Sequence, residues 1–148
     1  MTPPPPRTVG QRRTDTLHRL DHDVDVWVAT ADAAGAPHLV PLSFLWDGET
    51  LLISTVATSP TARNLRAGGR VRLTAGPTRD VVLVEGSAEL VDDLTAEVGD
   101  AFAVKTGFDP RELRDYAYFR IRPERIQAWR EANELAGRDL MVGGAWRG

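Results

Sequence analysis

The sequence has no cysteine, a single lysine, three histidines and no long apolar run in its 148 residues. Without cysteine, the chain can form no disulfide framework, no Cys-ligated metal site and no thiol nucleophile. No apolar stretch approaches the roughly 20 residues of a membrane-spanning helix. The proline-rich N-terminus also lacks the apolar segment of a signal peptide. We therefore expect a cytoplasmic protein that does not enter a membrane.

A basic excess is also missing. Lys and Arg number 18 against 21 Asp and Glu, which gives a formal net charge of -3. Because nucleic-acid-binding domains usually carry a basic excess on one face, this balance disfavours DNA or RNA as a partner. All of the cations except Lys105 are arginine. A GC-rich genome explains that bias, and the alternative is that some guanidinium groups bind phosphate or carboxylate.

The length suits one domain. We expect residues 1–10 to form a disordered, proline-rich tail and residues 11–148 to form the domain, which opens with a short helix over residues 11–20. A second helix begins at Ser59, with Pro60 in its first turn, and ends at Gly68 and Gly69. A third is capped by Asp93 and ends at Gly107. Residues 131–148 show no clear element.

Strands occupy most of the remaining chain. Short runs rich in β-branched and aromatic residues predict strands over residues 24–30, 38–46, 50–55, 70–75, 81–91, 115–121 and 125–130. Asp47 and Gly48 predict a hairpin turn, and Pro41 predicts a sheet edge or a bulge. Residues 81–84 are continuously apolar and so need cover on both faces, from the barrel interior and from a helix or a second subunit. Short connections between the strands predict a mainly β, antiparallel barrel with two or three short helices.

One segment has the composition of a ligand site. Residues 53–65 supply the hydroxyl groups of Ser54, Thr55, Thr58 and Ser59 where a strand leads into a helix N-terminus. Free backbone N–H groups and the positive end of the helix dipole bind anions, and Arg63 can add a charge-assisted contact. The alternative is a well-capped helix with a hydroxyl-rich entry.

Other chemistry is poorly supported. His18 and His22 are spaced four apart, as a metal site on a helix would require, but no third ligand is identifiable and we expect two solvated side chains and no metal. The chain contains neither a P-loop nor a G-x-S-x-G motif. We therefore name no catalytic acid or base.

Several motifs follow in order along the chain: G-x-P-H-x-V-P-L at residues 35–42, WDG-x-x-L-x-I-S-T at 46–55, S-x-x-A-R-N-L at 59–65, RVRL at 70–73, V-V-x-V-E-G-x-A-E at 81–89 and R-I-R-P-E-R-I-x-x-W at 120–129. Their order resembles the pyridoxamine 5'-phosphate oxidase-like split barrels, which bind flavin or deazaflavin. The resemblance covers about residues 24–130. It implies a six-stranded antiparallel split β-barrel that forms a homodimer with two cofactor clefts between the subunits.

The resemblance also implies which residues hold the cofactor. Its ring would lie along Pro41, Leu42 and Ser43. His38 begins the same strand, which suits a position at the pocket mouth; the alternative is a structural or exposed side chain. Arg125 or Trp129 of the partner subunit would close the cleft. The phosphate end would lie against Ser54, Thr55, Ser59, Thr61, Arg63 and Asn64.

The chain departs from the family pattern at its charges. The oxidases place basic residues on the phosphate where this chain has His38, Ser43, Pro60 and Thr61, and deazaflavin-using relatives commonly have a lysine at the position of Thr61. Arg63 is the one obvious cation left. The residues that bind vitamin B6 substrates are not recognisable, so the resemblance does not extend to oxidation of pyridoxamine phosphate.

We expect an oxidoreductase that uses coenzyme F-420 or FMN, with F-420 slightly favoured, and that transfers hydride to a small organic substrate. The cofactor carries the chemistry and the protein orients it. Three alternatives use the same barrel: a non-catalytic flavin-binding module, a heme-binding protein with His38 or His18 as axial ligand, and a barrel that has lost its cofactor.

Overall fold

The computed structural model describes residues 2–148. Among these residues it shows eight strands, three α-helices and two short 3₁₀ helices at Pro110–Glu112 and Ala132–Glu134. In chain order the elements are α1 (Val9–His22), β1 (Asp25–Ala31), β2 (Pro37–Trp46), β3 (Leu51–Val56), α2 (Pro60–Gly68), β4 (Arg70–Ala75), β5 (Val81–Val91), α3 (Ala96–Thr106), β6 (Tyr116–Trp129), β7 (Asp139–Val142) and β8 (Ala145–Trp146). The mainly β fold class is confirmed.

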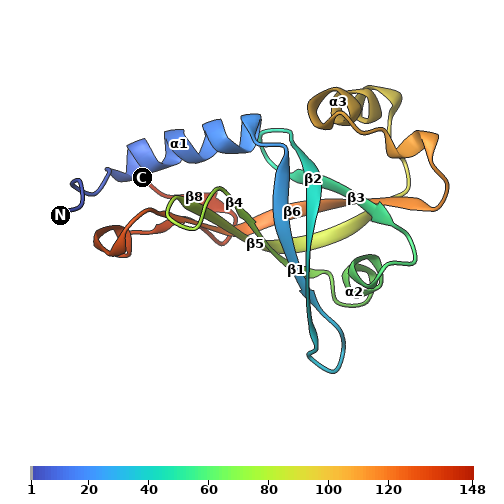
Figure 1. Cartoon of the computed structure of the whole chain (residues 1–148), viewed down its shortest axis with the longest axis horizontal. Coiled ribbons are helices and arrows are strands. Elements are labelled where there is room, and N and C mark those ends of the chain that lie inside the picture. Colours follow the sequence, from blue (N-terminus) through green and yellow to red (C-terminus); the bar gives the residue numbers. More distant parts are fainter. Residues whose placement is uncertain (1) are drawn as a thin grey trace.

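Six strands close into an antiparallel barrel. The sheet runs in the order β3-β2-β1-β4-β5-β6, and β3 pairs with β6 to complete the circle (Figure 1). Strands β7 and β8 extend the sheet beyond β6. The predicted six-stranded antiparallel barrel is therefore confirmed, with two strands added at one end.

The core lies inside this barrel. Side chains alternate in burial along β1 and β4, as expected for strands with one face toward the interior. Phe44, Ile53 and Phe119 have no exposed surface and meet in the centre. Ala62 and Leu65 of α2 join the same cluster, so α2 covers one end of the barrel.

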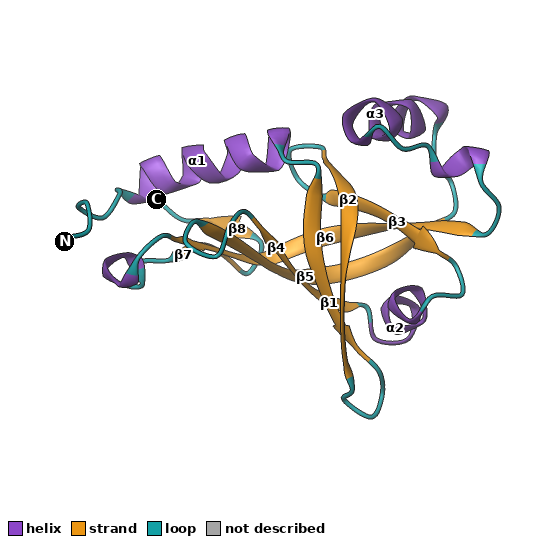
Figure 2. Ribbon diagram, in the orientation of Figure 1, coloured by secondary structure: helices purple, strands orange, loops and turns teal. Residues whose placement is uncertain are grey.

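The three helices lie outside the sheet (Figure 2). Helix α1 lies beside the chain termini, α2 lies at the opposite end of the barrel, and α3 lies over β2 and β3 (Figure 1). Helix α3 packs on a small second cluster of its own, formed by Leu52, Phe102 and Tyr118. No helix among residues 2–148 is long and apolar enough to cross a membrane.

Several predicted boundaries need correction. Helix α1 begins at Val9 and ends at His22, so it is longer at both ends than predicted. Thr95 caps α3, because its hydroxyl accepts from the Val98 N–H at 3.2 Å, whereas Asp93 was the predicted cap. Residues 139–142 and 145–146 form a hairpin that the sequence pattern did not indicate.

The predicted strands 115–121 and 125–130 are one strand, β6. It remains continuous through Pro123 because a bulge takes up the irregularity: Glu85 pairs with Arg125 and Gly86 with Pro123, so Glu124 is an extra residue in β6. Gly86 lies against the carbonyl oxygen of Arg122, and a Cβ there would collide with that oxygen. The prediction of two separate strands is therefore wrong, because the bulge, for which Gly86 leaves room, carries β6 across residues 122–124.

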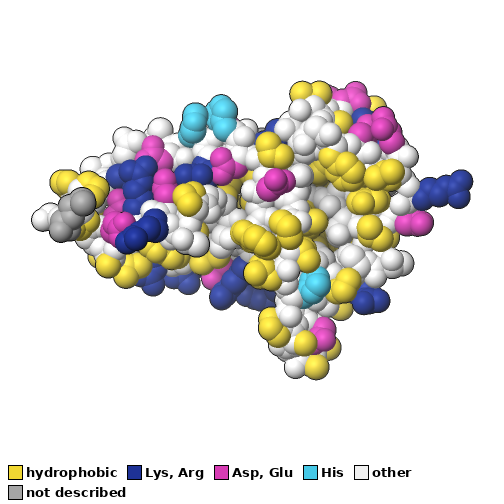
Figure 3. All heavy atoms as spheres, in the orientation of Figure 1, with side chains coloured by type: hydrophobic (Ala, Val, Ile, Leu, Met, Phe, Trp, Pro, Cys, Tyr) yellow, Lys and Arg dark blue, Asp and Glu magenta, His cyan; other side chains and the backbone are white. Residues whose placement is uncertain are grey.

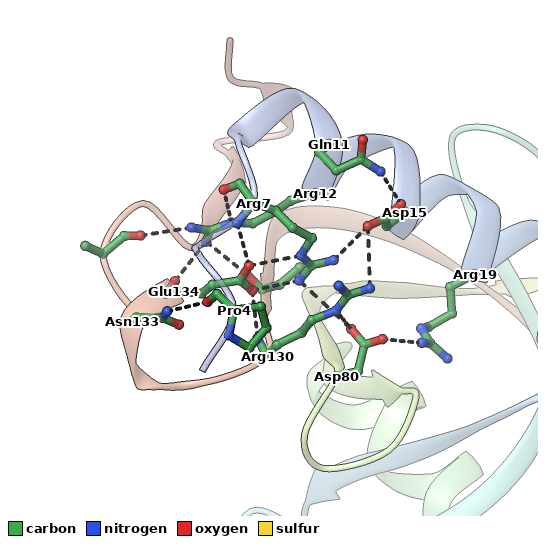
Figure 4. Close-up of polar contacts among 12 residues, drawn as sticks. Pro4, Arg7, Gln11, Arg12, Asp15, Arg19, Asp80, Arg130, Asn133 and Glu134 are labelled. Carbon is green, nitrogen blue, oxygen red and sulfur yellow. Dashed lines mark hydrogen bonds and ion pairs between the residues drawn. The ribbon is translucent and has the colours of Figure 1, made fainter. Parts of the chain in front are cut away.

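An ion-pair network joins the N-terminal segment to the C-terminal loop (Figure 4). Arg7 donates through Nη2 and Nε to both oxygens of Glu134, at 2.8 and 3.0 Å, and through Nη1 to Asp15 at 3.0 Å. The side chain of Glu134 is only 4% exposed. Asp80 sits beside them and pairs with Arg19 at 3.0 Å. The segment that precedes α1 is therefore attached to the barrel at Arg7.

Candidate functional site

A groove of about 340 Å³ opens where β2 and β3 separate. The two strands pair only over Phe44 to Trp46 and Leu51 to Ile53, and beyond that they diverge. Five of the twelve predicted site residues line the resulting opening: Pro41, Leu42, Ser43, Ser54 and Thr55. The split between these two strands thus brings the predicted ring site next to the hydroxyl groups of β3.

Pro41 shows why the strands part here. It pairs with Trp27 of β1 on one side, and on the other side β2 has no partner at this position. Proline has no N–H to donate to a neighbouring strand, so it suits a free edge. The prediction that Pro41 marks an edge is confirmed.

Hydroxyl groups form the polar part of the groove. Ser43 Oγ donates to Asp25 Oδ1 at 2.7 Å, and Ser54 Oγ donates to the carbonyl oxygen of Ala117 at 2.9 Å. Thr55 Oγ1 lies 3.3 Å from Ser59 Oγ, which links the groove to the start of α2. Sequence reasoning missed Asp25, because a carboxylate at a strand start gives no signal of a site.

Aromatic side chains form the wall on the α3 side. Phe102, Phe108 and Tyr116 line the groove, and Phe108 meets Tyr116 edge-to-face with ring centroids 5.6 Å apart. Phe102 meets Tyr118 in the same way, also at 5.6 Å. Sequence reasoning did not bring Phe102, Phe108 or Tyr116 to this site.

Tyr118 lies behind this wall with an unusual hydroxyl. It stands directly opposite Ser54 in the β3–β6 pairing, so both side chains point to the same face of the sheet. Its hydroxyl oxygen is the one buried side-chain polar atom among residues 2–148 without a hydrogen-bond partner. Burial raises the pKa of Tyr118, so the phenol is neutral.

The groove carries negative charge. Asp25 is the one acidic residue among its lining residues, and no Lys or Arg belongs to the lining within residues 2–148. In the space-filling view the surface beneath α3 is largely hydrophobic and uncharged, and an acidic side chain lies at its edge (Figure 3). An anion in this part of the groove would meet no cation of its own chain.

The start of α2 offers fewer donors than predicted. Ser59 caps the helix by accepting from the Ala62 N–H at 3.1 Å, and its carbonyl accepts from the Arg63 N–H. Pro60 has no N–H, so within the described residues Thr61 carries the free amide of the first turn. The side chain of Arg63 is exposed and lines neither the groove nor the cavity beyond α2.

Asn64 faces that second cavity, of about 560 Å³. Its side-chain amide donates to Thr30 Oγ1 at 3.1 Å. Arg70, Arg72 and Glu85 line the same space, and Arg72 is paired with Glu85 at 3.1 Å. The predicted residues are therefore divided between two cavities, with Asn64 separated from Ser54 and Thr55.

The remaining predicted residues do not reach the groove of their own chain. His38 is half-buried and pairs with Thr30 across β1 and β2. Arg125 forms an ion pair with Asp139 at 3.0 Å. The guanidinium of Arg138 lies 6.0 Å from the centre of the Trp129 ring.

The two other histidines, His18 and His22, stand outside the groove. They are exposed near the end of α1, and their rings stack with centroids 4.1 Å apart. Within residues 2–148 they belong to no group of three or more side chains able to hold a metal ion.

The groove fits the planar part of a flavin-type cofactor. Its volume lies within the range of small-molecule sites, roughly 300–1,000 Å³, and it combines apolar walls with a few hydroxyl groups. The fit to a phosphate is poorer. Beyond the groove, this chain offers a phosphate only four groups: the hydroxyls of Thr55 and Ser59, the amide of Thr61 and the exposed side chain of Arg63.

A six-stranded antiparallel barrel with a groove at the split between two strands defines the class of split β-barrels. Within that class, the family model described as pyridoxamine 5'-phosphate oxidase matches residues 20–130. The chain belongs to this family. No curated protein matches it at the level of sequence.

Solved structures share the fold at low sequence identity. An F420 reductase is 21% identical with a TM-score of 0.63, over 74% of this chain and 93% of that protein. A FAD-binding protein from Mesorhizobium loti is 21% identical with a TM-score of 0.64, over 77% and 89%. The heme storage protein HutZ from Vibrio cholerae is 19% identical with a TM-score of 0.63, over 75% and 89%. These similarities establish the fold and leave the ligand open.

Proposed function

We propose that this protein is a cytoplasmic, homodimeric oxidoreductase that uses a flavin-type cofactor, coenzyme F-420 or FMN, to transfer hydride to a small organic substrate. The observation that carries the proposal is the groove in the β2–β3 split, which gathers Pro41, Leu42, Ser43, Ser54 and Thr55 in a chain of this family. F-420 is slightly favoured, because the motifs at residues 35–42 and 59–65 resemble the deazaflavin-using group more closely.

In this proposal the chain binds and orients the cofactor. The ring lies along Pro41 to Ser43, and the anionic end extends past Thr55 toward Ser59 and Arg63. When bound, the cofactor supplies the hydride chemistry. The aromatic wall on the α3 side excludes water from the ring, and the Thr55–Ser59 contact directs the anionic end toward α2.

Titration with three ligands tests this assignment. Purified protein is titrated with F-420, FMN and heme in parallel, with fluorescence and absorbance as readouts. We expect saturable binding of F-420 or FMN. A Soret shift with heme alone would replace the proposal with the heme-binding alternative. No binding of any ligand would indicate a barrel that has lost its cofactor.

A comparison of FMN with riboflavin locates the phosphate. Riboflavin has the same ring without the phosphate. Arg63→Ala should therefore weaken the binding of FMN by about tenfold, because one charge-assisted contact is lost, and leave the binding of riboflavin unchanged. Arg114→Ala, at an exposed arginine outside the groove lining, is the control. Equal effects on both ligands, or none on FMN, would place the phosphate elsewhere.

The proposed dimer is supported by an uncovered apolar face. Trp27 on β1 and Leu39 on β2 are 51% and 60% exposed. Trp27 pairs with Pro41, and Leu39 with Ala29, so these four side chains share the outer face of the sheet. Exposed apolar patches of this kind mark interaction sites, and a second copy here would also cover the outer side of β5, as its apolar run requires.

Light scattering tests the dimer. We expect twice the chain mass of 16.2 kDa for the wild type and a folded monomer for Leu39→Glu. Val104→Glu, at an 86% exposed position on the solvent side of α3, should remain a dimer. A monomeric wild type would remove the cleft between subunits.

A further inference from the structure

We infer that the aromatic part of the groove beneath α3 is a substrate site for planar aromatic compounds that are neutral or cationic, and that Asp25 disfavours anionic ones. The identification of the bound compound as a substrate rests on the proposed function. The binding preference itself does not.

Three aromatic rings shape this part of the groove. Phe102 comes from α3, Phe108 from the turn after it and Tyr116 from the start of β6, so three separate segments converge on one space. Aromatic faces and edges bind other planar rings by offset stacking and edge-to-face contact. The wall therefore favours a flat ring system over a flexible aliphatic chain.

The position of Phe108 is fixed by its own turn. Gly107 ends α3 in the left-handed region, at a φ of 72°. Thr106 Oγ1 accepts from the Phe108 N–H at 3.2 Å and donates to the Phe102 carbonyl oxygen at 2.8 Å, so it ties Phe108 to the last turn of α3. The wall is thus preorganised, and a ligand need not order it.

Tyr118 lies behind this wall and is not one of the groove's lining residues. Phe102 covers Tyr118 edge-to-face, and the phenol oxygen has no partner among residues 2–148. Helix α3 rests here on Leu52, Phe102 and Tyr118, so apolar packing holds Phe102 in the wall.

Charge decides which planar compounds are accepted. Asp25 lines the groove and is held at its edge by the 2.7 Å bond from Ser43. Among residues 2–148 no lining Lys or Arg offsets it. A ligand in the groove would lie close to the Asp25 carboxylate, and charges within a Debye length interact even when partly screened. The binding of an anionic ring is therefore disfavoured, and a cationic ring is tolerated.

The lining of the groove thus has two different parts. Thr55 leads to Ser59 and the N-terminus of α2, which suits the anionic end of a cofactor. The aromatic part consists of Phe102, Phe108 and Tyr116, and Tyr116 pairs with Val56, the residue after Thr55. A cofactor ring along β2 would leave the aromatic part for the compound that it reduces or oxidises.

Three naphthalene probes with one ring and different charge test the inference. Full-length protein is titrated with 2-naphthol, 2-naphthalenesulfonate and 2-naphthylmethylammonium, followed by the anisotropy of their own fluorescence. We expect the neutral and cationic probes to bind, and the sulfonate to bind about tenfold more weakly, as one nearby carboxylate implies. Equal affinity for the three probes, or no binding of any, would overturn the inference.

Variants assign the preference to residues. Asp25→Asn keeps an oxygen that can accept from Ser43, and it should bring the sulfonate close to the affinity of 2-naphthol. Glu124→Gln removes an exposed carboxylate outside the groove and should change nothing. Phe108→Ala should weaken all three probes by about three- to tenfold through loss of ring contact, whereas Val104→Ala on the outer side of α3 should not. A charge preference that persists in Asp25→Asn would contradict the role of Asp25.

The outcome is separable from the proposed function. If neither F-420 nor FMN binds but the probes show the charge preference, the binding site stands and the oxidoreductase proposal fails. If a cofactor binds but the three probes bind with equal affinity or not at all, the proposed function stands and this inference fails.

Discussion

At the scale of single residues, Arg7 and Glu134 form the most deeply buried ion pair of the described residues. Glu134 is nearly without exposed surface and accepts three bonds from Arg7, two from its side chain and one from its backbone N–H. A buried carboxylate is tolerated only while its partners remain, because removal of one leaves an uncompensated charge.

Arg7→Met should therefore destabilise the protein by about 3–5 kcal/mol. Arg79→Met is the matched control, since Arg79 pairs with Glu131 at 3.3 Å but its side chain is 80% exposed, and it should cost at most about 1 kcal/mol. Urea denaturation of both variants measures the difference. Equal losses would mean that burial of Glu134 does not matter.

The same pair predicts a dependence on pH. The bonds from Arg7 lower the pKa of Glu134 from 4.5 to about 2. Because the folded value lies below the unfolded one, the stabilisation is fully present above about pH 4.5 and is lost as the pH falls toward 2. The gap in unfolding free energy between wild type and Arg7→Met should narrow over this window, and a constant gap would contradict the pairing.

For Tyr118 we expect a substitution to stabilise the protein, in contrast to Arg7→Met. Since its buried hydroxyl has no partner among the described residues, Tyr118→Phe removes an unsatisfied group and should stabilise the protein by about 1 kcal/mol. Thermal unfolding at matched protein concentration measures it. A loss of stability would show that the hydroxyl is bonded in solution.

Residue chemistry explains what sequence reasoning found at the site and what it missed. The hydroxyl groups of Ser54 and Thr55 were predicted because they lie in one short segment with the helix start. The contribution of Asp25 could not be predicted, since it depends on the β1–β2 register that brings Asp25 opposite Ser43. Asn64 was assigned to the same segment, but the turn of α2 points it to the other cavity.

At the scale of elements, one glycine decides the course of β5 and β6. Gly86→Ala would place a Cβ against the carbonyl oxygen of Arg122 at the register shift. We expect a loss of roughly 1–3 kcal/mol from this overpacking. Gly68→Ala, at the end of α2 with open space around the new Cβ, should be neutral or stabilising. Circular dichroism melts of the two variants test the contrast.

Helix α3 is joined to α1 by the lone lysine. Lys105 Nζ donates to the carbonyl oxygen of Leu20 at 3.1 Å and lies 3.7 Å from the centre of the Phe44 ring. Burial lowers the pKa of Lys105 to about 8, against the opposing influence of Asp23 and Asp21.

A stability measurement across alkaline pH follows from this lysine. Because the unfolded chain, with its pKa of 10.5, holds the proton more tightly, stability should rise between about pH 8 and 10.5 in wild type. Lys105→Met lacks the group and should lack that rise. Denaturation curves of both proteins at the two pH values measure this change. An equal change in unfolding free energy in wild type and Lys105→Met would contradict the lowered pKa of Lys105.

The sequence predicted correctly those elements whose signals come from residues that are neighbours in the chain. The cap at Ser59, the turn at Asp47 and Gly48, and the strand β4 all follow from neighbouring residues. The continuity of β6 and the β7–β8 hairpin depend on pairing between distant segments, which no window of sequence contains. The predicted gap between residues 121 and 125 has that cause.

At the scale of the whole molecule, the order of strands predicted the barrel, and the split between β2 and β3 places the groove. What one chain cannot supply is the second wall that the family resemblance implies, with Arg125 or Trp129 of the partner subunit closing the cleft. Both residues are committed to contacts within their own chain, with Asp139 and Arg138. In the proposed function two copies together form the cofactor site, and Arg125 or Trp129 would have to leave these contacts to close it.

Titration of coenzyme F-420 and FMN into wild type and into the monomeric, folded Leu39→Glu variant tests this most directly. The account predicts one cofactor bound per chain in the dimeric wild type and an affinity reduced at least about tenfold in the monomer, since an interface that completes the site contributes binding energy. A monomer that binds as tightly as the wild type, or a dimer that binds neither cofactor, would contradict it.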